Sequence, residues 1–449
     1  MDLGDIAGST DHCDTQATLM NYDIGILGGG ESGVGAALLA NAKGLNPFVS
    51  DIGELTSEFL HELKDAGIDY EEHGHSIDIL SQCKEIIKSP GIPSTTAVIS
   101  KLAKSGLKII SEIELASRYI PPAAKLIGIT GSNGKTTTTN LTYHILQSAG
   151  LSVAKGGNLG TSLARLLLEE PYDYYVIEIS SFQLDDIESF RPDIAVLLNI
   201  TPDHLDRYRH DFELYADAKI KIGEHQKAPD LFIYNGDDPS IVARLSGLHA
   251  RLLSIDGSND VPIKNPYLRG AHNRFNAAVS RAIAIHIGIE METIDKAMLT
   301  FVNDNHRMQP VREICGVSWI NDSKATNVDA VSFALRAIEG NIIWIVGGVD
   351  KGNDYSVLLH MVQDKVKSII SLGLDNTLII NAFAGIKEVH SVDTMVKAVT
   401  LSHSLAQRED TVLLSPACAS FDLFNNYKDR GQQFIECVRG LPNTVSIEL

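Results

Sequence analysis

Short apolar runs that end in polar or glycine-rich turns recur along this chain, with amphipathic segments between them. Such runs are Ile24–Leu27, Pro47–Ser50, Tyr174–Glu178 and Ile342–Val346. A few apolar residues bounded by turn signals are typical of strands that are buried in a parallel sheet. Because helix-like segments separate the runs, the pattern predicts an α/β protein built from repeated β–α units.

Length and composition extend that picture to several domains. The chain has 449 residues, which corresponds to about three domains of roughly 150 residues each. Its hydrophobic content of 44% is sufficient for several cores. The first 21 residues are acidic and polar, unlike a signal peptide, so we expect a flexible tail there, with Met20 as an alternative start.

Charge and cysteine content argue against several classes of protein. The formal net charge of −19 disfavours a general nucleic-acid or membrane-surface binder, because both need basic surfaces. No apolar run reaches the roughly 18 residues that a membrane span needs. The five cysteines lack paired metal-type spacing and are expected to be reduced thiols in the cytosol. We therefore expect no nucleic-acid and no membrane partner.

A glycine-rich turn carries the strongest chemical signal. The apolar run at 126–130 leads into Gly131-Ser-Asn-Gly-Lys-Thr136, and a helix-like segment, residues 140–148, follows. The N–H groups of such a turn can bind phosphate oxygens, Lys135 can reach the outer phosphates, and the Thr136 hydroxyl can ligate Mg²⁺. Ile129 stands where the strict P-loop has glycine, and an ordinary β–α turn is the alternative. Gly-Lys-Thr in this context predicts a nucleoside triphosphate site.

A second glycine-rich turn lies near the N-terminus. Residues 28–33 have the pattern G-x-G-x-x-G after the run Ile24–Leu27. Asp51 follows the next apolar run, about 20 residues later. The arrangement fits a dinucleotide, the pyrophosphate of another nucleotide, or glycines that only allow a helix to pack tightly on a strand. The residues of this segment leave the three interpretations open.

Polar residues follow two buried runs in the middle of the chain. Glu178 ends the run that starts at Tyr174, and His204 lies in the loop after residues 195–200. Open α/β sheets bind ligands at the carboxyl ends of their strands, and both side chains could ligate Mg²⁺. A structural carboxylate and a hydrogen-bonded histidine are the alternatives. Lys219 belongs to an amphipathic segment, where a solvated face is the alternative.

Further turn signals occur in the rest of the chain. They lie at residues 156–160, 235–238, 268–276, 306–307, 321–327 and 415–431. Each could be structural by itself. Because they follow apolar strands, we expect them to line one cleft, with a third α/β domain at the C-terminal end.

Five of these motifs together resemble the Mur ligases, the amide-bond ligases of cytoplasmic peptidoglycan assembly. The motifs are Thr130-Gly-Ser-Asn-Gly-Lys-Thr136, Glu178-Ile-Ser-Ser-Phe-Gln-Leu184, Thr201-Pro-Asp-His-Leu-Asp-Arg-Tyr208, Asn321-Asp-Ser-Lys-Ala-Thr-Asn327 and Ser415-Pro-Ala-Cys-Ala-Ser420. The first shares the family's departure from the strict P-loop pattern. The resemblance covers nearly the whole chain from Tyr22 and is strongest to the family member that joins D-glutamate to UDP-N-acetylmuramoyl-L-alanine.

The resemblance implies three α/β domains after a flexible tail at residues 1–21. They are a Rossmann-like UDP-sugar-binding domain at 22–113, a P-loop ATPase domain at 114–304 and a Rossmann-like amino-acid-binding domain at 305–449. The resemblance also favours the diphosphate of a UDP-sugar, rather than NAD, as the ligand of the first glycine turn.

The implied reaction is ATP-dependent amide synthesis through an acyl phosphate. The L-alanyl carboxylate attacks the γ-phosphate of ATP, and the amine of D-glutamate then displaces phosphate. Because two anions must meet, such a site needs cations more than it needs an acid or a base. The resemblance implies two Mg²⁺ ions, a carbamylated Lys219 that ligates one of them, and a cytoplasmic monomer.

The resemblance also assigns roles to individual residues. The implied catalytic residues are Lys135, His204 and Lys219. The implied metal ligands are Thr136, Glu178, His204 and Lys219. The implied ATP-binding residues are Gly131, Ser132, Asn133, Gly134, Lys135, Thr136, Thr137, Asn273, Asn276, Arg307 and Asp322. The UDP-substrate residues are Ser32, Gly91, Asn158 and His204, and the D-glutamate residues are Lys324, Thr326, Lys351, Ser420 and Tyr427.

Departures from the family pattern leave some details open. Ile52-Gly53 stands where familiar members carry Thr-Arg around uracil, and Tyr427 stands where they carry Phe. Another Mur ligase or a folylpolyglutamate synthase would share the ATP core, although the latter lacks a separate UDP-binding domain. A regulatory module that has lost catalysis is a further alternative. It would have lost Lys135, Glu178, His204 or Asp322, and all four are present.

Overall fold

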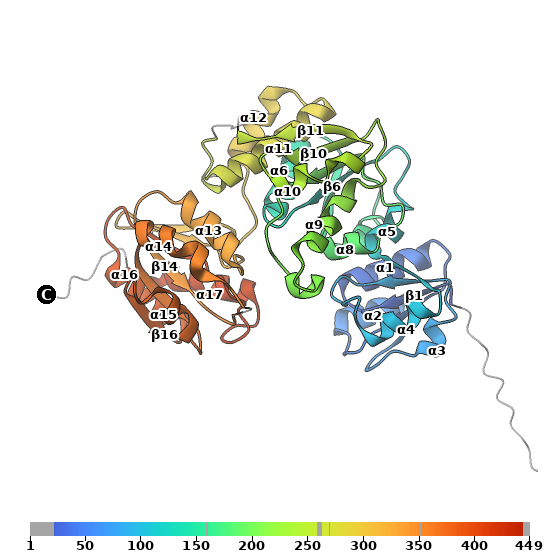
Figure 1. Cartoon of the computed structure of the whole chain (residues 1–449), viewed down its shortest axis with the longest axis horizontal. Coiled ribbons are helices and arrows are strands. Elements are labelled where there is room, and N and C mark those ends of the chain that lie inside the picture. The colour runs from blue at the N-terminus through green and yellow to red at the C-terminus, as the bar shows by residue number, and fades with distance from the viewer. Residues whose placement is uncertain (1–21, 159, 258–262, 269, 351, 443–449) are drawn as a thin grey trace, which may run out of the picture. The chain divides into compact units, whose positions relative to one another are not determined.

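The structure is a computed structural model that describes residues 22–158, 160–257, 263–268, 270–350 and 352–442 (Figure 1). These residues form three sheets with helices in their connections, so the predicted α/β class with three parallel-sheet domains is confirmed. The chain divides into two compact units, residues 1–110 and 111–449. The boundaries at 113/114 and 304/305 stay predictions, and the predicted tail at 1–21 lies outside the described residues.

The first unit is built on a five-stranded sheet in the order β3-β2-β1-β4-β5. Its strands are β1 (Ile24–Leu27), β2 (Pro47–Ser50), β3 (Asp69–Glu71), β4 (Glu85–Lys88) and β5 (Lys108–Ser111). Its helices are α1 (Glu31–Ala42), α2 (Ser57–Asp65), α3 (Ile77–Leu80) and α4 (Ala97–Lys104). β1 pairs in parallel with both β2 and β4. The strand order reverses there, which is the usual position of a ligand crevice in such sheets.

The second unit begins with a six-stranded parallel sheet in the order β11-β10-β9-β6-β8-β7. Its strands are β6 (Lys125–Thr130), β7 (Val153–Gly157), β8 (Tyr174–Glu178), β9 (Ile194–Leu197), β10 (Leu231–Asn235) and β11 (Arg251–Ile255). Its helices are α5 (Glu112–Ser117), α6 (Lys135–Ser148), α7 (Leu163–Leu166), α8 (Ser181–Asp185), α9 (Phe212–Ile220), α10 (Pro239–Val242), α11 (Ala271–Ile287) and α12 (Met291–Thr300).

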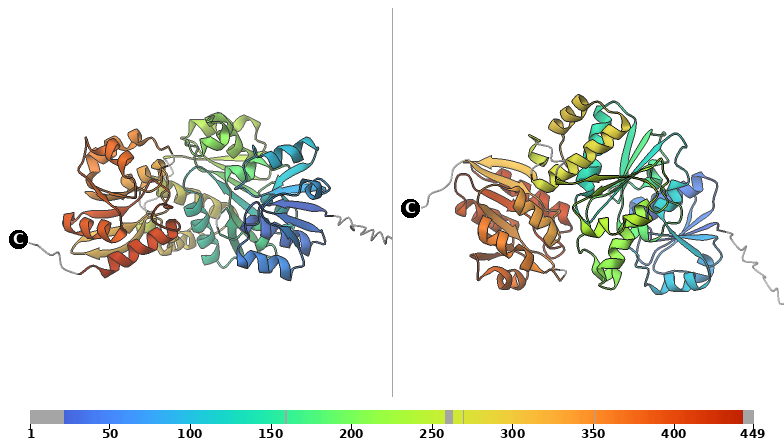
Figure 2. Two further views of the ribbon diagram at one scale, coloured as in Figure 1. Left: turned by 90° about the horizontal axis from the view of Figure 1, so that it is seen from below. Right: turned by 45° about the horizontal axis from the view of Figure 1, so that its top comes forward.

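Apolar side chains on both faces of this sheet explain why its strands read as continuous hydrophobic runs. On one face, Ile127 and Ile129 share a cluster with α6 and α11 residues. On the other face, a Cβ added at Gly128 would lie 3.1 Å from the Ile179 side chain and 3.3 Å from that of Ile222. Figure 2 shows helices on both sides of the sheet.

α6 begins earlier than the sequence predicts. The helix-like segment is predicted from Asn140, whereas the helix starts at Lys135. Residues 136–139 are four threonines, and β-branched side chains have a low helix propensity. All four are buried, so tertiary packing outweighs that propensity.

The third sheet has the order β12-β13-β17-β14-β15-β16. Its strands are β12 (Gln309–Ile314), β13 (Val317–Asn321), β14 (Ile342–Val346), β15 (Val366–Leu372), β16 (Val389–Val392) and β17 (Thr411–Leu414). Its helices are α13 (Val328–Ala337), α14 (Leu359–Lys365), α15 (Thr377–Phe383), α16 (Met395–Leu405) and α17 (Tyr427–Gly440). Alternate residues of β14 face two cores: Trp344 packs in one cluster, and Ile343 and Ile345 pack in the other.

One antiparallel edge strand departs from the predicted alternation of strands and helices. β12 pairs antiparallel with β13, and the register shifts between Pro310 and Arg312. The connecting residues Cys315 and Gly316 have φ values of +53° and +78°. Two consecutive positive φ angles are typical of the tight hairpin turn that matches the twist of its strands. A cysteine at such a position gives little sequence signal, which is why the hairpin is absent from the sequence-based prediction.

None of the helices in the described part of the chain combines the length and the apolar composition that spanning a bilayer requires.

Candidate active site

The turn between β6 and α6 depends on two glycines with positive φ. These angles are +155° at Gly131 and +87° at Gly134. A Cβ added at Gly134 would lie 2.6 Å from Asn276 Oδ1, so only glycine allows α11 to approach this closely. Because α6 starts directly after the turn, its first N–H groups and its positive end lie beside the turn, as an anion site requires.

Lys135 lies against the turn that it follows. Its Nζ donates to Gly131 O at 2.7 Å and to Ser132 O at 2.9 Å. Burial lowers the pKa of Lys135, and the Glu178 carboxylate opposes that shift. The ammonium is thus held at the phosphate loop by carbonyl groups of the loop itself.

The Glu178 carboxylate accepts hydrogen bonds from two residues of the second unit, Thr136 and Asn158. Thr136 Oγ1 donates to Glu178 Oε2 at 2.7 Å, and Asn158 Nδ2 donates to Glu178 Oε1 at 3.0 Å. Arg307, which is 171 positions further along the chain, donates from its Nη2 to Thr136 Oγ1. Burial would raise the pKa of Glu178, but the charges of Lys135 and Arg307 outweigh it and hold that pKa below its usual value. The carboxylate is therefore ionised.

Lys219 is buried, in contrast to the solvated face that its amphipathic segment also allowed. Only 2% of its surface is exposed, and its Nζ donates to Gly131 O at 3.0 Å. Burial, together with the nearby charge of Lys135, lowers the pKa of Lys219 well below its usual value. Lys221 extends elsewhere and donates to Asp185 O at 3.3 Å. Burial thus favours the neutral form of this amine, which lies at the Gly131 turn.

His204 lies in the loop that follows β9, in the left-handed region with a φ of +52°. Its Nε2 is 3.6 Å from Asp203 Oδ2, and its ring meets the Phe182 ring edge-on with 5.3 Å between centroids. About half of the side chain is exposed. Its ring is therefore accessible to solvent.

The donor set fits a magnesium ion, which prefers hard oxygen ligands and keeps several water or phosphate ligands. The Thr136 hydroxyl and the Glu178 carboxylate meet at 2.7 Å, directly at the phosphate loop. Among the described residues, no three His, Cys, Asp or Glu side chains gather in a way that could hold a metal ion.

Residues of α11 and of the segment around β12 and β13 border the loop. A small cavity of about 70 Å³ is lined by residues that include Asn133, Asn273, Arg307, Asp322 and Lys324. A second cavity, of about 380 Å³, adjoins it and is lined by residues that include Asn276, His272, Phe275 and Phe333. The predicted ATP-binding residues of the loop, of α11 and of the C-terminal segment therefore come together around these two cavities.

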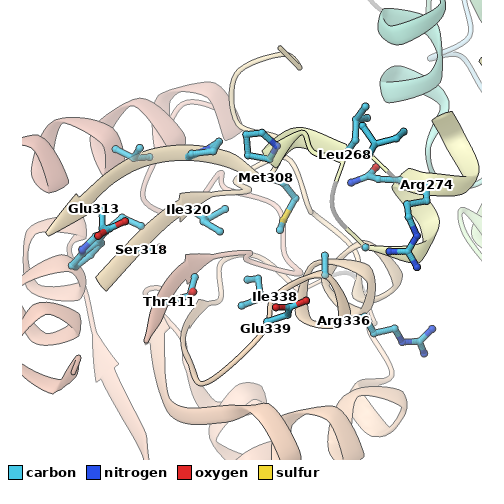
Figure 3. A pocket seen from close by; sticks show the side chains of 18 of the residues that line it. Leu268, Arg274, Met308, Glu313, Ser318, Ile320, Arg336, Ile338, Glu339 and Thr411 are labelled. Atoms are coloured by element: carbon cyan, nitrogen blue, oxygen red, sulfur yellow. The ribbon is translucent and has the colours of Figure 1, made fainter. Parts of the chain in front are cut away.

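The largest of the described cavities has a different lining. It measures about 960 Å³ and includes Leu268, Arg274, Met308 and Ile320. Figure 3 shows Met308 and Ile320 directed into this space. It shares Asn273 with the predicted ATP-binding residues and contains none of the other predicted site residues. We therefore assign the chemistry to the two smaller cavities.

Asp322 is a buried carboxylate with two hydrogen-bond donors. Met308 N donates to its Oδ1 at 3.1 Å, and Ser415 Oγ donates to its Oδ2 at 3.0 Å. Burial raises the pKa of Asp322 from 3.8 to about 7, and the two hydrogen bonds offset only part of that effect. This carboxyl group is therefore partly protonated near neutral pH.

The raised pKa of Asp322 makes stability depend on pH. The pKa of Asp322 is higher in the folded protein than the usual value of 3.8, so protonation of this group stabilises the folded state. That contribution is complete below about pH 3.8 and is lost as the pH rises to about 7. The Asp322→Asn variant lacks this loss, which is on the order of 1 kcal/mol per pH unit. We expect its melting temperature, relative to that of the ligand-free wild type, to rise between pH 5 and pH 7.5. A difference that stays constant over that range would contradict the assignment.

Of the predicted D-glutamate residues, Lys324 and Thr326 lie on the loop after β13, Ser420 lies on the loop after β17, and Tyr427 is the first residue of α17. Burial and the charge of Arg307 lower the pKa of Lys324 to about 8, and its Nζ lies 5.4 Å from the centroid of the Tyr427 ring. Ser420 is buried, and Thr326 is partly buried. Lys351, the other predicted member, lies outside the described residues.

Two buried polar residues, Arg430 and Gln183, were not predicted as site residues from the sequence. Arg430 is buried in α17, where it donates to Ser323 Oγ, Ser323 O and Cys418 O at 3.0, 2.9 and 3.2 Å. It thereby joins the loop after β13 to the loop after β17. Gln183 is buried at the start of α8, and its Nε2 has no hydrogen-bond partner among the described residues. Gln183 lies inside a quoted motif and Arg430 lies in the turn region 415–431, but their roles depend on contacts that the sequence alone does not show.

The predicted UDP-substrate residues of the first unit lie at the ends of β1 and β4. Ser32 is in the first turn of α1, and Gly91 lies just after β4. A Cβ added at Gly33 would lie 1.8 Å from Gly28 O, so this glycine is required for α1 to pack against the turn. Asp51 accepts from Gly29 N at 2.6 Å and from Gly53 N at 2.7 Å.

Three domain families match in order along the chain. The MurD N-terminal domain matches residues 23–98, the Mur ligase middle domain matches 129–293, and the glutamate ligase domain of the Mur ligases matches 306–418. A UDP-N-acetylmuramoylalanine–D-glutamate ligase of Porphyromonas gingivalis is 48% identical over 442 residues, covering 92% of this chain and 98% of that protein. A protein of the same name from Cytophaga hutchinsonii is 45% identical and covers the same shares.

Solved structures share the fold at lower identity. A UDP-N-acetylmuramate–alanine ligase from Thermotoga maritima has a TM-score of 0.58 at 18% identity, covering 93% of this chain and 99% of that one. The MurF ligase from Thermotoga maritima in complex with ADP has a TM-score of 0.59 at 18% identity, covering 89% and 97%. At such identities the similarity concerns the fold alone.

Proposed function

This chain belongs to the Mur ligase family, and from that premise we infer that it is a UDP-N-acetylmuramoylalanine–D-glutamate ligase of peptidoglycan biosynthesis. The observation that carries this conclusion is its similarity, over 92% of the chain, to a ligase of that name. A folylpolyglutamate synthase or a Mur ligase of different specificity has less support, because the first unit matches the N-terminal domain of one member, MurD.

The chemistry joins two anions before it forms an amide. The L-alanyl carboxylate of the first substrate attacks the γ-phosphate of ATP, and ADP leaves. The amine of D-glutamate then attacks the carbonyl carbon of the acyl phosphate, and phosphate leaves as the new C–N bond forms. Catalysis therefore depends on positive charge at the phosphate oxygens.

Lys135 and the N–H groups at the start of α6 supply that charge in our proposal. The ammonium lies at the loop through Gly131 O and Ser132 O, so it needs only a short movement to meet a bound γ-phosphate. Arg307 reaches the same loop through Thr136. Asn273, Asn276 and Asp322 complete the nucleotide site, with the base in the cavity beside Phe275.

Thr136 and Glu178 are the proposed ligands of one Mg²⁺ ion, and His204 and Lys219 are the proposed ligands of a second. When bound, these ions neutralise negative charge on the phosphates and on the attacking carboxylate. Lys219 serves as a carbamate in this proposal. Its burial and its strongly lowered pKa support that role, because only a neutral amine captures carbon dioxide.

The UDP-linked substrate is proposed to use Ser32 and Gly91 of the first unit and Asn158 and His204 of the second. The glycine turn after β1 supports diphosphate binding, since its N–H groups precede the 12-residue helix α1. Asp51 already accepts two backbone hydrogen bonds, and Ile52 is 74% exposed beside it. The uracil contacts therefore differ in detail from those of members with Thr-Arg at this point.

D-Glutamate is proposed to bind between the loops after β13 and β17. The residues are Lys324, Thr326, Lys351, Ser420 and Tyr427. Cations and hydroxyls bind carboxylates through charge-assisted hydrogen bonds. We propose that the protein acts as a cytoplasmic monomer, as the sequence resemblance implies.

The choice of amino acid tests this function. We expect phosphate release from ATP to require UDP-N-acetylmuramoyl-L-alanine together with D-glutamate, because the site offers cations and hydroxyls for two carboxylates. L-Glutamate, L-alanine and L-lysine, each assayed at the same concentration, serve as controls. Equal acceptance of D-glutamate, L-alanine and L-lysine would rule out the assignment.

A further inference from the structure

The segment between α12 and β12 is fastened to the P-loop helix shortly before it reaches Arg307. α12 ends at Thr300 and β12 begins at Gln309. Asn303 lies between them, is 7% exposed, and lines the same small cavity as Arg307. None of the roles described above involves Asn303.

Asn303 contacts one face of α6. Its Nδ2 donates to Thr137 Oγ1 at 3.1 Å, and its Oδ1 accepts from Asn140 Nδ2 at 3.5 Å. Thr137 and Asn140 are three residues apart, so they lie on the same side of the helix. Oδ1 also accepts from Asp304 N at 3.0 Å. Both polar atoms of this buried amide are therefore used to fix the connecting segment.

Lys155 of β7 contacts Asn140 and so supports the contact between Asn140 and Asn303. Its Nζ donates to Asn140 Oδ1 at 2.6 Å and lies 4.0 Å from Asp304 Oδ1. It also lies 5.2 Å from the centroid of the Tyr143 ring, one helical turn beyond Asn140. Lys155 thus orients the Asn140 amide, so that its Nδ2 is directed to Asn303. We call Asn303, Thr137, Asn140 and Lys155 the linker clamp.

We propose that Asn303 is a positioning residue for nucleotide binding: through the linker clamp it fixes the backbone four residues before Arg307 and so holds the guanidinium beside the phosphate loop. The inference rests on the ATP site proposed above. Arg307 has one buried nitrogen, Nε, without a hydrogen-bond partner among the described residues, and its Nη2 donates to Thr136. Its position therefore depends mainly on where the connecting segment places it.

A double-mutant cycle tests whether Asn303 acts through Arg307. Equilibrium binding of Mg-ATP is measured by calorimetry for the wild type, Asn303→Ala, Arg307→Ala and the double variant. Loss of the buried amide leaves the Thr137 and Asn140 groups unsatisfied, so Asn303→Ala should weaken binding about tenfold. If Asn303 acts by positioning Arg307, the double variant should bind no more weakly than Arg307→Ala alone.

Two further variants separate positioning from a general loss of stability. Asn305→Ala changes an exposed asparagine of the same segment and should leave binding unchanged. Lys155→Met changes a partly exposed residue, so it should fold normally, and should weaken binding about twofold, an effect that disappears in the Arg307→Ala background. Additive effects in either cycle, or unchanged binding in Asn303→Ala, would overturn the proposal.

This test is independent of the amino-acid substrate. Nucleotide binding needs neither D-glutamate nor the muramoyl substrate. Failure of the amino-acid panel would therefore disprove the proposed function and leave the linker clamp intact. Additive cycles alongside normal D-glutamate-dependent phosphate release would disprove only the linker clamp.

Discussion

Replacing Lys135 by alanine is expected to abolish phosphate release and to leave the fold intact. The ammonium is partly buried at the phosphate loop, within 3 Å of the carbonyl oxygens of Gly131 and Ser132. It is therefore placed to meet the charge that develops on the γ-phosphate oxygens. Loss of one preorganised group of this kind costs about 3 kcal/mol or more of transition-state stabilisation, which corresponds to at least a hundredfold in rate.

The measurement is phosphate release at saturating substrates, with circular dichroism and thermal unfolding as the check on folding. Lys125→Ala is the matched control, because Lys125 lies at the other end of β6 and forms an exposed ion pair with Asp193. Its activity should match that of the wild type. Near-wild-type turnover of Lys135→Ala would remove this lysine from the mechanism.

The Lys219→Ala variant is expected to be at least a hundredfold less active, and acetate should restore part of the activity. Burial lowers the pKa of this lysine and so favours the neutral amine that can form a carbamate, and a carbamate would offer two oxygen ligands to Mg²⁺. A small carboxylic acid can occupy the space that the variant leaves. The measurement is phosphate release with and without acetate.

Lys221→Ala is the control for Lys219, because Lys221 lies two residues away and contacts Asp185 O instead. It should keep wild-type activity and show no response to acetate. A second measurement needs no turnover: the wild type, exposed to ¹³C-labelled bicarbonate, should give a carbamate resonance that is absent from Lys219→Ala. Full activity of Lys219→Ala without added acid would show that no carbamate is needed.

The strands that were predicted best are those that are buried on both faces. The runs predicted at β1, β2 and β8 have the bounds that the structure gives them. Their side chains face apolar helices on both sides, so hydrophobicity alone marks the whole strand. The start of α6 was harder to predict, because its four threonines favour other conformations until neighbouring elements bury them.

The sequence predicts those parts of the site whose residues lie close together in one motif. In a P-loop the lysine, the threonine and the glycine turn lie within a few residues of one another, so the sequence alone predicts that they bind the same phosphates. Arg430 and Asn303 act on partners that are 107 and 166 positions away. Such contacts follow from how the elements pack, and a single sequence read by itself contains no signal for them. Burial of Lys219 likewise depends on a distant segment, the turn between β6 and α6, where its Nζ donates to Gly131 O.

The irregular strand β12 bears on how the protein behaves at high concentration. A strand at the edge of a sheet offers unpaired N–H and C=O groups, on which a second molecule can add a strand and start aggregation. In β12, Pro310 lacks an N–H, and the register shift beside it bends the strand. Arg312 Nη1 also donates to Arg439 O and Leu441 O at 3.0 Å each, which places a charged group on this strand. The third sheet therefore offers a poor template for strand addition along this edge, and intermolecular β-pairing there is disfavoured.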